Sequence, residues 1–355
     1  MHTGGHPDHP ITVDVQHHYP AVIDDVADGS PSCRNFLRSA WYAGDVADGA
    51  ATLVARMRDG TPFAALPTRM MRPFLPGVRA VAGSYWPFRT LVVKANTCPK
   101  AIRAMVAHPH FRRMFSPMWR LGPVYADDPS AALVLQGMRD DGWHVLARNM
   151  GATWRLSLAG LHGEGKWPRK STLKRLRGYE RQLIARHGAI RYEVINGADW
   201  NDNVCGVLAD IERRSWVGKQ ENGGDTKFLN RKARCYWTKA VRDTAIAKAL
   251  SATILFAGER AIAFSFDLRS GDGQYSIASS YDEDYAPFRP GKIVTYHQFQ
   301  HALAQGVQWI DLGAGDSGYK KEIGAEKGAE IHDYMLVRYG WLAGVIARFW
   351  QRGEV

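Results

Sequence analysis

Arginine and lysine flank a Pro-Gly step at residues 289–292, where the sequence reads Arg289-Pro290-Gly291-Lys292. Proline suits the first turn of a helix, and glycine allows a ligand to approach the backbone closely. A helix N-terminus also offers several N–H groups without intrahelical partners and about half a positive charge. Two cationic side chains at such a helix start therefore predict a binding site for a phosphate or a pyrophosphate.

Carboxylates lie on both sides of this step. Asp282 begins the acidic turn that precedes it, and Asp311 lies near the end of the apolar run that follows it. A carboxylate can take a proton from an amine or hold a cationic amine in place, directly or through water. Asp311 is our first candidate for this chemistry, and Asp282 and Asp316 are second candidates. Asp311 fits a buried turn or helix-capping role equally well.

Regular elements are expected to position these residues. The alternation over 274–281 predicts a strand, which the acidic turn 282–284 ends. A helix begins at Pro290 and runs to about Gln305, with Gly306 as its C-terminal cap. Residues 307–312 predict a buried strand that carries Asp311. The order of strand, helix and strand indicates a βαβ-like unit with an anion site at the start of its helix.

This segment resembles the core of the GNAT acyltransferases, in which the loop before the corresponding helix cradles the pyrophosphate of coenzyme A. More narrowly, it resembles the acetyltransferase family linked to bacterial cellulose biosynthesis, which is itself similar to the Fem-type aminoacyl transferases. The residues that carry the resemblance are Tyr281-Asp282, Pro290-Gly291-Lys292, Asp311-Leu312-Gly313, Gly315-Asp316 and Tyr319-Lys320, with weaker similarity at Ser171, 212–216 and 252–268. The usual GNAT loop has a longer Arg/Gln-x-x-Gly-x-Gly/Ala signature, of which this chain keeps Arg289-Pro290-Gly291.

The resemblance implies an α/β (α+β) fold of two tandem GNAT-like domains, each with a mixed central sheet flanked by helices. It implies an N-acyltransferase that moves an acyl group from acyl-CoA to an amine of a sugar, peptide or lipid precursor. Exopolysaccharide or cell-envelope biosynthesis is the expected setting. Acyl-CoA is the expected co-substrate, bound at Arg289, Pro290, Gly291 and Lys292, and no metal is expected.

Further site residues follow from the same resemblance. Tyr319 is expected to protonate the departing thiolate, and backbone N–H groups near the end of the 274–281 strand are expected to polarise the thioester carbonyl. Trp216 is expected to line the substrate cleft, together with Asp316 and Lys320. Lys320 is expected to stabilise an anionic acceptor or a phosphate. Tyr319 and Trp216 fit simple packing roles as well. With no Ser-His-Asp signature or reactive-cysteine context, direct transfer in a ternary complex is favoured over a covalent acyl-enzyme.

Other functions stay open. The basic stretch Lys166–Arg191, on a helix with Ser171 as its predicted cap, would suit tRNA and hence a Fem-like transferase that uses aminoacyl-tRNA. A non-catalytic partner of a polysaccharide synthase is a third alternative. Residues 313–318 also match G-x-G-x-x-G, with Asp333 about twenty residues on. A dinucleotide-binding fold needs a helix after its glycines and more chain than follows here, so this match predicts little.

The composition fits a globular protein of two domains. The chain has 355 residues, 45% of them hydrophobic, and a formal net charge of +11, which favours acidic partners. No apolar run approaches the roughly 18 residues of a membrane span, and no signal peptide is readable. Cysteines at 33, 98, 205 and 235 form no C-x-x-C pair, so reduced thiols are expected. The expected location is cytoplasmic, or peripheral at the inner membrane.

Four segments are predicted. They are a disordered tail rich in His, Pro and Asp over 1–32, an N-terminal GNAT-like domain over 33–160, a GNAT acyltransferase domain over 161–338, and an amphipathic basic helix over 339–355. Within the domains, residues 143–147 and 154–158 are expected to form a strand pair, and 227–249 a helix. The C-terminal helix fits either contact with an anionic membrane or docking on its own domain.

Overall fold

The computed structural model describes residues 11–44, 49–71, 77–83, 85, 87–159, 167–220, 225–315 and 318–350. The chain divides into two compact units, the first of Met1–Ala152 with Ala329–Val355 and the second of Thr153–Gly328. The predicted boundary after residue 160 is close to this division, but residues 329–338 were expected in the second domain. They belong to the first because strand β13 (Glu326–Val337) pairs with β6 (Met118–Tyr125) there.

The first unit is built on a sheet with the strand order β1-β2-β3-β4-β6-β13-β7, and β5 pairs with β3. The β4–β6 pair is parallel, whereas β1–β2, β2–β3 and β6–β13 are antiparallel. Its other elements are β1 (Ile11–His17), α1 (Val22–Asp28), η1 (Ser32–Arg34), α2 (Ser39–Ala43), β2 (Ala51–Met57), β3 (Pro62–Met70), β4 (Arg79–Val81), β5 (Val92–Val93), α3 (Pro99–Ala107), α4 (Pro109–Phe115), α5 (Pro129–Asp140), β7 (His144–Ser157) and α12 (Gly340–Trp350).

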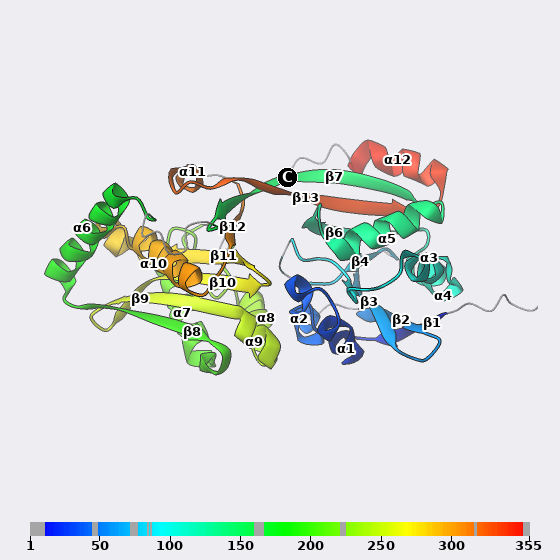
Figure 1. Ribbon diagram of the computed structural model, residues 1–355, viewed down its shortest axis with the longest axis horizontal. Helices are drawn as coiled ribbons and strands as arrows, with labels where there is room; N and C mark the ends of the chain where they lie inside the picture. The colour runs from blue at the N-terminus through cyan, green and yellow to red at the C-terminus, as the bar shows by residue number, and fades with distance from the viewer. Residues whose placement is uncertain are drawn as a thin grey trace, which may run out of the picture. The chain divides into compact units, whose positions relative to one another are not determined.

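The second unit has the strand order β7-β12-β11-β10-β9-β8, in which only the β11–β12 pair is parallel. Its elements are α6 (Lys170–His187), β8 (Ile190–Asn196), η2 (Gly197–Asp199), α7 (Asp202–Arg214), α8 (Arg231–Ala240), α9 (Thr244–Ala249), β9 (Leu250–Ala257), β10 (Arg260–Ser270), β11 (Gly273–Tyr281), η4 (Glu283–Phe288), α10 (Pro290–Ala304), β12 (Trp309–Ala314) and α11 (Tyr319–Glu322). Each unit is therefore a mixed sheet flanked by helices, which confirms the predicted fold class (Figure 1).

Helices pack on both faces of the second unit's sheet. Val294 of α10 packs in one core cluster with Ala263 of β10. The next residue of that strand, Phe264, makes a ring contact with Phe228, which precedes α8. Successive side chains of a strand point to opposite faces. The α10 side and the α8 side are therefore two separate apolar layers, and the sheet between them is buried.

The sheet opens between its two parallel strands. β11 and β12 are paired at Gly273–Trp309, Gln274–Ile310 and Tyr275–Asp311, and no further pair is formed between them. β11 nevertheless continues to Tyr281, with β10 along its other edge. No described strand lies against residues 276–281 on the β12 side. The backbone polar groups on that edge are therefore available to a ligand.

Residues 11–32 differ from the predicted disordered tail. β1 pairs antiparallel with β2 from Ile11–Met57 to His17–Ala51, and α1 follows it. Ile11 and Val13 are buried in the core of the first unit. For residues 11–17, the alternation of apolar residues is thus a better predictor of structure than the high content of Pro, His and Asp. Residues 1–10 lie outside the described part of the chain.

Two predicted elements have other boundaries. The expected strand pair over 143–158 is one strand, β7, because the chain does not turn at Gly151 and the strand lies between β13 and β12. The expected helix 227–249 is two helices, because the Asp243 carboxylate accepts hydrogen bonds from the N–H groups of Ala245 and Ile246 and so starts α9. Ser171 lies inside α6, whose N-cap is Arg169.

The predicted C-terminal helix is confirmed as α12. Ala343 packs with Met335 and Val337 of β13, so the helix is docked on its own unit. Trp341 and Phe349 lie on the opposite side, with 73% and 74% of their surface exposed. Among the described helices of the whole chain, none is long and apolar enough to cross a bilayer.

Candidate active site

The Arg289–Lys292 step forms the start of α10, as predicted. Arg289 has the left-handed conformation (φ 54°, ψ 46°) and is the residue at which η4 ends and α10 begins. The N–H groups of Lys292 and Ile293 both donate to the Arg289 carbonyl. No described residue accepts a hydrogen bond from the Gly291 N–H. This N–H is therefore the donor of the first turn that stays open to an anion.

Gly291 is held against the end of β11. A Cβ atom at this position would lie 2.8 Å from Cδ1 of Tyr281, closer than ordinary carbon contacts allow. Glycine is therefore needed for the Tyr281 ring to pack over the first turn of α10. From the sequence, Gly291 was expected to let a ligand approach the backbone. The structure adds a second reason for glycine, which is the packing of the Tyr281 ring.

A cavity of about 220 Å³ lies beside Lys292, between α6, α10 and α11. Its lining includes the cations Lys292 and Arg175 and the phenol of Tyr296. Burial raises the pKa of Tyr296, so this group stays a neutral hydrogen-bonding phenol at physiological pH. Lys292 Nζ lies 3.4 Å from the Glu322 carboxylate, which connects the start of α10 to α11.

Asp282 is buried, and its carboxylate is hydrogen-bonded to two arginines. Its carboxylate accepts hydrogen bonds from Arg214 Nε at 2.7 Å and from Arg260 Nη2 at 2.6 Å. It also accepts from the N–H of Asp284 and so caps η4. These three donors occupy the Asp282 carboxylate from within the protein. Through these contacts Asp282 stabilises the corner between η4 and α10, which ends at Arg289.

Asp311 is 1% exposed and lies on β12 at the last paired position before the sheet opens. One carboxylate oxygen accepts from Thr153 Oγ1 at 2.7 Å, and the other accepts from the Gly313 N–H at 2.8 Å. The second contact is an Asx-turn, the turn role that the sequence left open for this residue. Asp311 thus shapes the turn after β12 from a place next to the opening.

Lys320 is also turned towards the protein itself. It is 5% exposed, and its Nζ donates to the carbonyls of Gly313, Ala314 and Gly315 at 3.0, 3.0 and 2.7 Å. Three such bonds use the three donors of an ammonium group. Lys320 therefore stabilises the 313–315 turn, and its role in binding an anionic acceptor stays a prediction.

Tyr319 begins α11 and is 41% exposed, one turn from Glu322, the partner of Lys292. Three contacts connect the segments that carry the predicted site residues. Lys292 pairs with Glu322, and Gly313 bonds both Asp311 and Lys320. Asp316 lies outside the described residues.

Trp216 follows α7 and is 53% exposed. Its segment is fastened to η4, since the Lys219 ammonium pairs with the Glu283 carboxylate. Arg214, two residues before Trp216, reaches Asp282. The exposed indole is therefore held near the η4–α10 corner by two ion pairs, a placement that fits the predicted cleft wall.

Several residues that support the candidate site were not predicted from the sequence. Arg214 and Arg260 lie 68 and 22 positions from Asp282, and Thr153 lies 158 positions from Asp311. Glu212 accepts from the N–H groups of Lys227, Phe228 and Leu229, and burial raises its pKa. No local pattern marks such pairs, because each partner comes from a different element.

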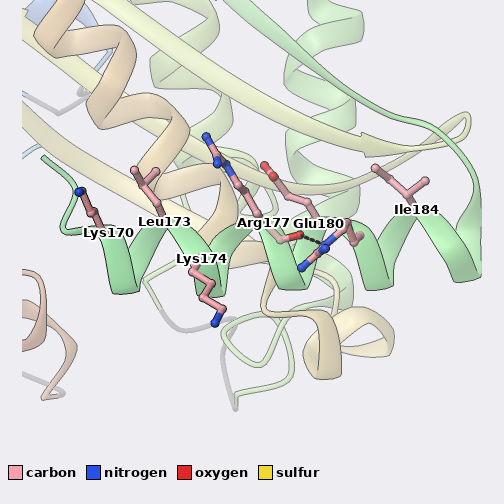
Figure 2. Close-up of a pocket in the computed structure, with 7 residues that line it drawn as sticks. Lys170, Leu173, Lys174, Arg177, Glu180 and Ile184 are labelled. Carbon is pink, nitrogen blue, oxygen red and sulfur yellow. Dashed lines mark hydrogen bonds between the residues drawn. The ribbon is translucent and has the colours of Figure 1, made fainter. Parts of the chain in front are cut away.

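The basic helix α6 exposes one cationic face, shown in Figure 2. The residues along it bound a surface hollow of about 560 Å³ and are Lys170, Leu173, Lys174, Arg177, Glu180, Arg181 and Ile184. They recur every three or four positions and so share one side of the helix. Leu176 and Leu183 on the other side are buried. The face is thus a solvated basic surface, and Lys292 is not among the residues that bound it.

Comparison with known proteins identifies the fold of the second unit. Residues 170–321 match the family described as Acetyltransferase (GNAT) domain. No curated protein matches the chain as a whole or in part. The matched range begins with α6 and ends within α11, so it contains the opening between β11 and β12 and the start of α10.

Solved structures share the fold at low sequence identity. The crystal structure of FemX is 10% identical with a TM-score of 0.58, and the match covers 94% of this chain and 100% of FemX. L-PGS from Bacillus licheniformis is 11% identical with a TM-score of 0.55, covering 95% and 97%. The C-terminal domain of a putative lysylphosphatidylglycerol synthetase from Agrobacterium fabrum is 13% identical with a TM-score of 0.54, covering 94% and 98%.

The family match over residues 170–321 supports the class of the second unit, whereas the solved structures show the fold alone. The chain contains a GNAT-type acetyltransferase domain, and this supports the predicted acyltransferase activity at the level of the class. More narrowly, the chain is similar in fold to FemX, as the Fem-like resemblance of the sequence implied.

Proposed function

We propose that this protein is an acyl-CoA-dependent N-acyltransferase whose donor lies along the free edge of β11 and at the start of α10. The opening of the sheet after Tyr275 and Asp311 carries the proposal. It leaves an edge of N–H and C=O groups beside the parallel pair β11–β12, and β11 leads through η4 to Arg289. An extended thioester can add to such an edge as a strand does.

The chain offers a group for each part of the donor. The Gly291 N–H and the Arg289 and Lys292 side chains would bind the pyrophosphate, and the cavity beside Lys292 and Arg175 would take further anionic groups. A backbone N–H on the edge over 276–281 would polarise the thioester carbonyl. Tyr319, exposed at the start of α11, would protonate the departing thiolate.

The acceptor in this proposal is an amine. Asp311 is next to the opening, but it already accepts from Thr153 and Gly313, so it would act on the amine through water or through its charge. Asp282 would position the corner rather than move a proton. Trp216 would form one wall of the acceptor site. A sugar, peptide or lipid precursor of the cell envelope or of an exopolysaccharide, cellulose included, is the substrate class that we propose.

Isothermal titration with acetyl-CoA and with a long-chain acyl-CoA tests the donor. We expect saturable binding by the wild-type protein that an Arg289→Ala, Lys292→Ala double variant loses. A Lys174→Ala, Arg181→Ala variant removes the same charge from the α6 face and should bind normally. Equal loss in both variants would show non-specific charge attraction and contradict the proposed site.

A second candidate is transfer from aminoacyl-tRNA. The basic face of α6, with Lys170, Lys174 and Arg177, favours it, since phosphate contacts supply most of the affinity for nucleic acid. Under this candidate the Lys174→Ala, Arg181→Ala variant would lose a salt-sensitive binding of tRNA while acyl-CoA would not bind. The same titrations therefore separate the two donors. The non-catalytic alternative predicts that Tyr319→Phe leaves function in cells unchanged.

The proposed location is the cytoplasm, with contact to the inner membrane through α12. Trp341 and Phe349 are exposed on that helix, and Arg348 lies on the same side. Aromatic residues with a cation are typical of helices that lie in a membrane interface.

A further inference from the structure

A basic hollow lies on the α7–α8 side of the second unit, apart from every residue of the proposed active site. It has a volume of about 430 Å³. Its lining combines the cations Arg231, Arg234, Lys239 and Arg242 with Asp202, Cys205, Cys235 and Thr238. Four cations therefore face one carboxylate around a single concave surface.

Helical spacing explains how the cations come together. Arg231, Arg234 and Lys239 recur at intervals of three and five along α8, and Arg242 follows in the turn after the helix. The opposite side of α8 is apolar, with Tyr236 and Trp237 buried. Burial of that side leaves Arg231, Arg234 and Lys239 on the side that faces the hollow, whereas the exposed Lys232 does not line it.

The four cations outnumber the one carboxylate that lines the hollow, Asp202. In the described part of the chain, no ion pair or side-chain hydrogen bond joins any of the four to another residue. The protein pairs its arginines elsewhere, as where Arg120 and Arg148 meet Asp333 and where Arg214 and Arg260 meet Asp282. Arg234 and Lys239 are moreover only partly exposed, so water compensates them less than it does a fully solvated side chain.

Like charges on one helix face repel each other, and a bound anion would relieve that repulsion. Arg231 and Lys239 are eight residues apart, or about 12 Å along a helix axis. A ligand with one charged centre cannot contact all four cations across this span, whereas one with two linked phosphate groups can. We infer that the α7–α8 hollow binds a soluble ligand that carries a diphosphate, at a site separate from the acyl donor.

The free thiols of the chain provide a direct test. Cys235 lies in the hollow and is exposed, whereas Cys98 is exposed in the first unit and serves as an internal control. The rates at which iodoacetamide alkylates the two thiols are measured by mass spectrometry, with and without inorganic pyrophosphate. Iodoacetamide is neutral, so pyrophosphate cannot slow it by screening an attraction between reagent and protein.

We expect pyrophosphate to slow alkylation of Cys235 saturably and to leave Cys98 unchanged, with inorganic phosphate protecting only at higher concentration. In an Arg234→Ala, Lys239→Ala variant the half-protecting concentration should rise by roughly tenfold or more, as for the loss of two charge-assisted contacts. If that variant does not fold, Arg231→Ala with Arg242→Ala serves instead. The Lys174→Ala, Arg181→Ala variant should resemble the wild type.

The inference is overturned if Cys235 reacts at the same rate at every pyrophosphate concentration, or if Cys98 is slowed equally. Equal potency of phosphate and pyrophosphate would exclude a site for two linked phosphates. Because acyl-CoA binding does not enter the readout, failure here leaves the proposed acyl transfer untouched.

Discussion

Three charged side chains of the candidate site form hydrogen bonds that stabilise its loops and turns. Asp282, Asp311 and Lys320 were predicted as acid–base or binding residues from their order in the sequence. In the structure each makes several short contacts with the protein itself. A buried polar group must have such partners, since leaving it unpaired costs about 1–3 kcal/mol. Charged residues near a glycine-rich turn can therefore be predicted as a group, but their division into structural and reactive members cannot.

Lys320 allows this distinction to be measured. Lys320→Met removes the donor from three carbonyls, so we expect a loss of roughly 1–3 kcal/mol in the free energy of unfolding. Lys321→Met is the matched control, because Lys321 is the neighbouring lysine, is exposed, and lies with its Nζ 5.3 Å from the Trp154 ring centroid. Urea denaturation of both variants checks the expectation. Equal stability of Lys320→Met and the wild type would return Lys320 to the predicted role of binding an anion.

Asp267 predicts a pH dependence of stability. Burial raises its pKa to about 7, and the hydroxyls of Ser265 and Ser276 donate to its carboxyl group. The pKa of an unfolded Asp is about 3.9, so between these values the folded state holds a proton that the unfolded state has lost. The stabilising contribution is complete below about pH 4 and disappears as the pH rises through about 7.

Asp267→Asn removes this titration and keeps the shape of the side chain. We expect the melting temperature of the wild type to fall, relative to that of the variant, as the pH rises from about 4 to about 7. Thermal unfolding of both proteins across this range is the measurement. Parallel curves would mean that Asp267 is ionised throughout.

At the scale of elements, the sequence predicted the strand–helix–strand order around α10 well. The predicted strand 274–281 is β11 at 273–281, and the predicted helix to Gln305 is α10 at 290–304. Proline at the helix start and Gly306 after its end are local signals, and they do not depend on distant contacts. The opening between β11 and β12 could not be predicted, because strand pairing is decided between elements.

Two glycines in helices give opposite predictions. Gly291→Ala places a Cβ atom against Tyr281, so we expect lower stability and weaker binding of acetyl-CoA. Gly178→Ala, within α6, adds a methyl group with nothing within 4 Å, so it should raise stability by roughly 0.5–1 kcal/mol. Thermal unfolding and titration of both variants test the pair. If Gly291→Ala is as stable as Gly178→Ala, the Tyr281 contact does not constrain the corner.

For the whole molecule, the sequence predicted two mixed α/β domains, and the structure has two compact units. Composition and the number of elements carry that information. The path of the chain between units was harder to predict. Residues 329–355 belong to the first unit, because Tyr334 and Leu336 of β13 are part of its core. This contact joins residues far apart in the sequence, so no local pattern predicts it.

The central claim is that the donor lies along β11 and at the start of α10. Hydrogen–deuterium exchange with and without acetyl-CoA tests it directly, because exchange reports the N–H groups that are proposed to bind. The account predicts slower exchange in peptides covering 276–281 and 289–293, and unchanged exchange over the α3 peptide 99–107 of the first unit. Saturable binding of acetyl-CoA with protection elsewhere, or with none on the β11 edge, would contradict it.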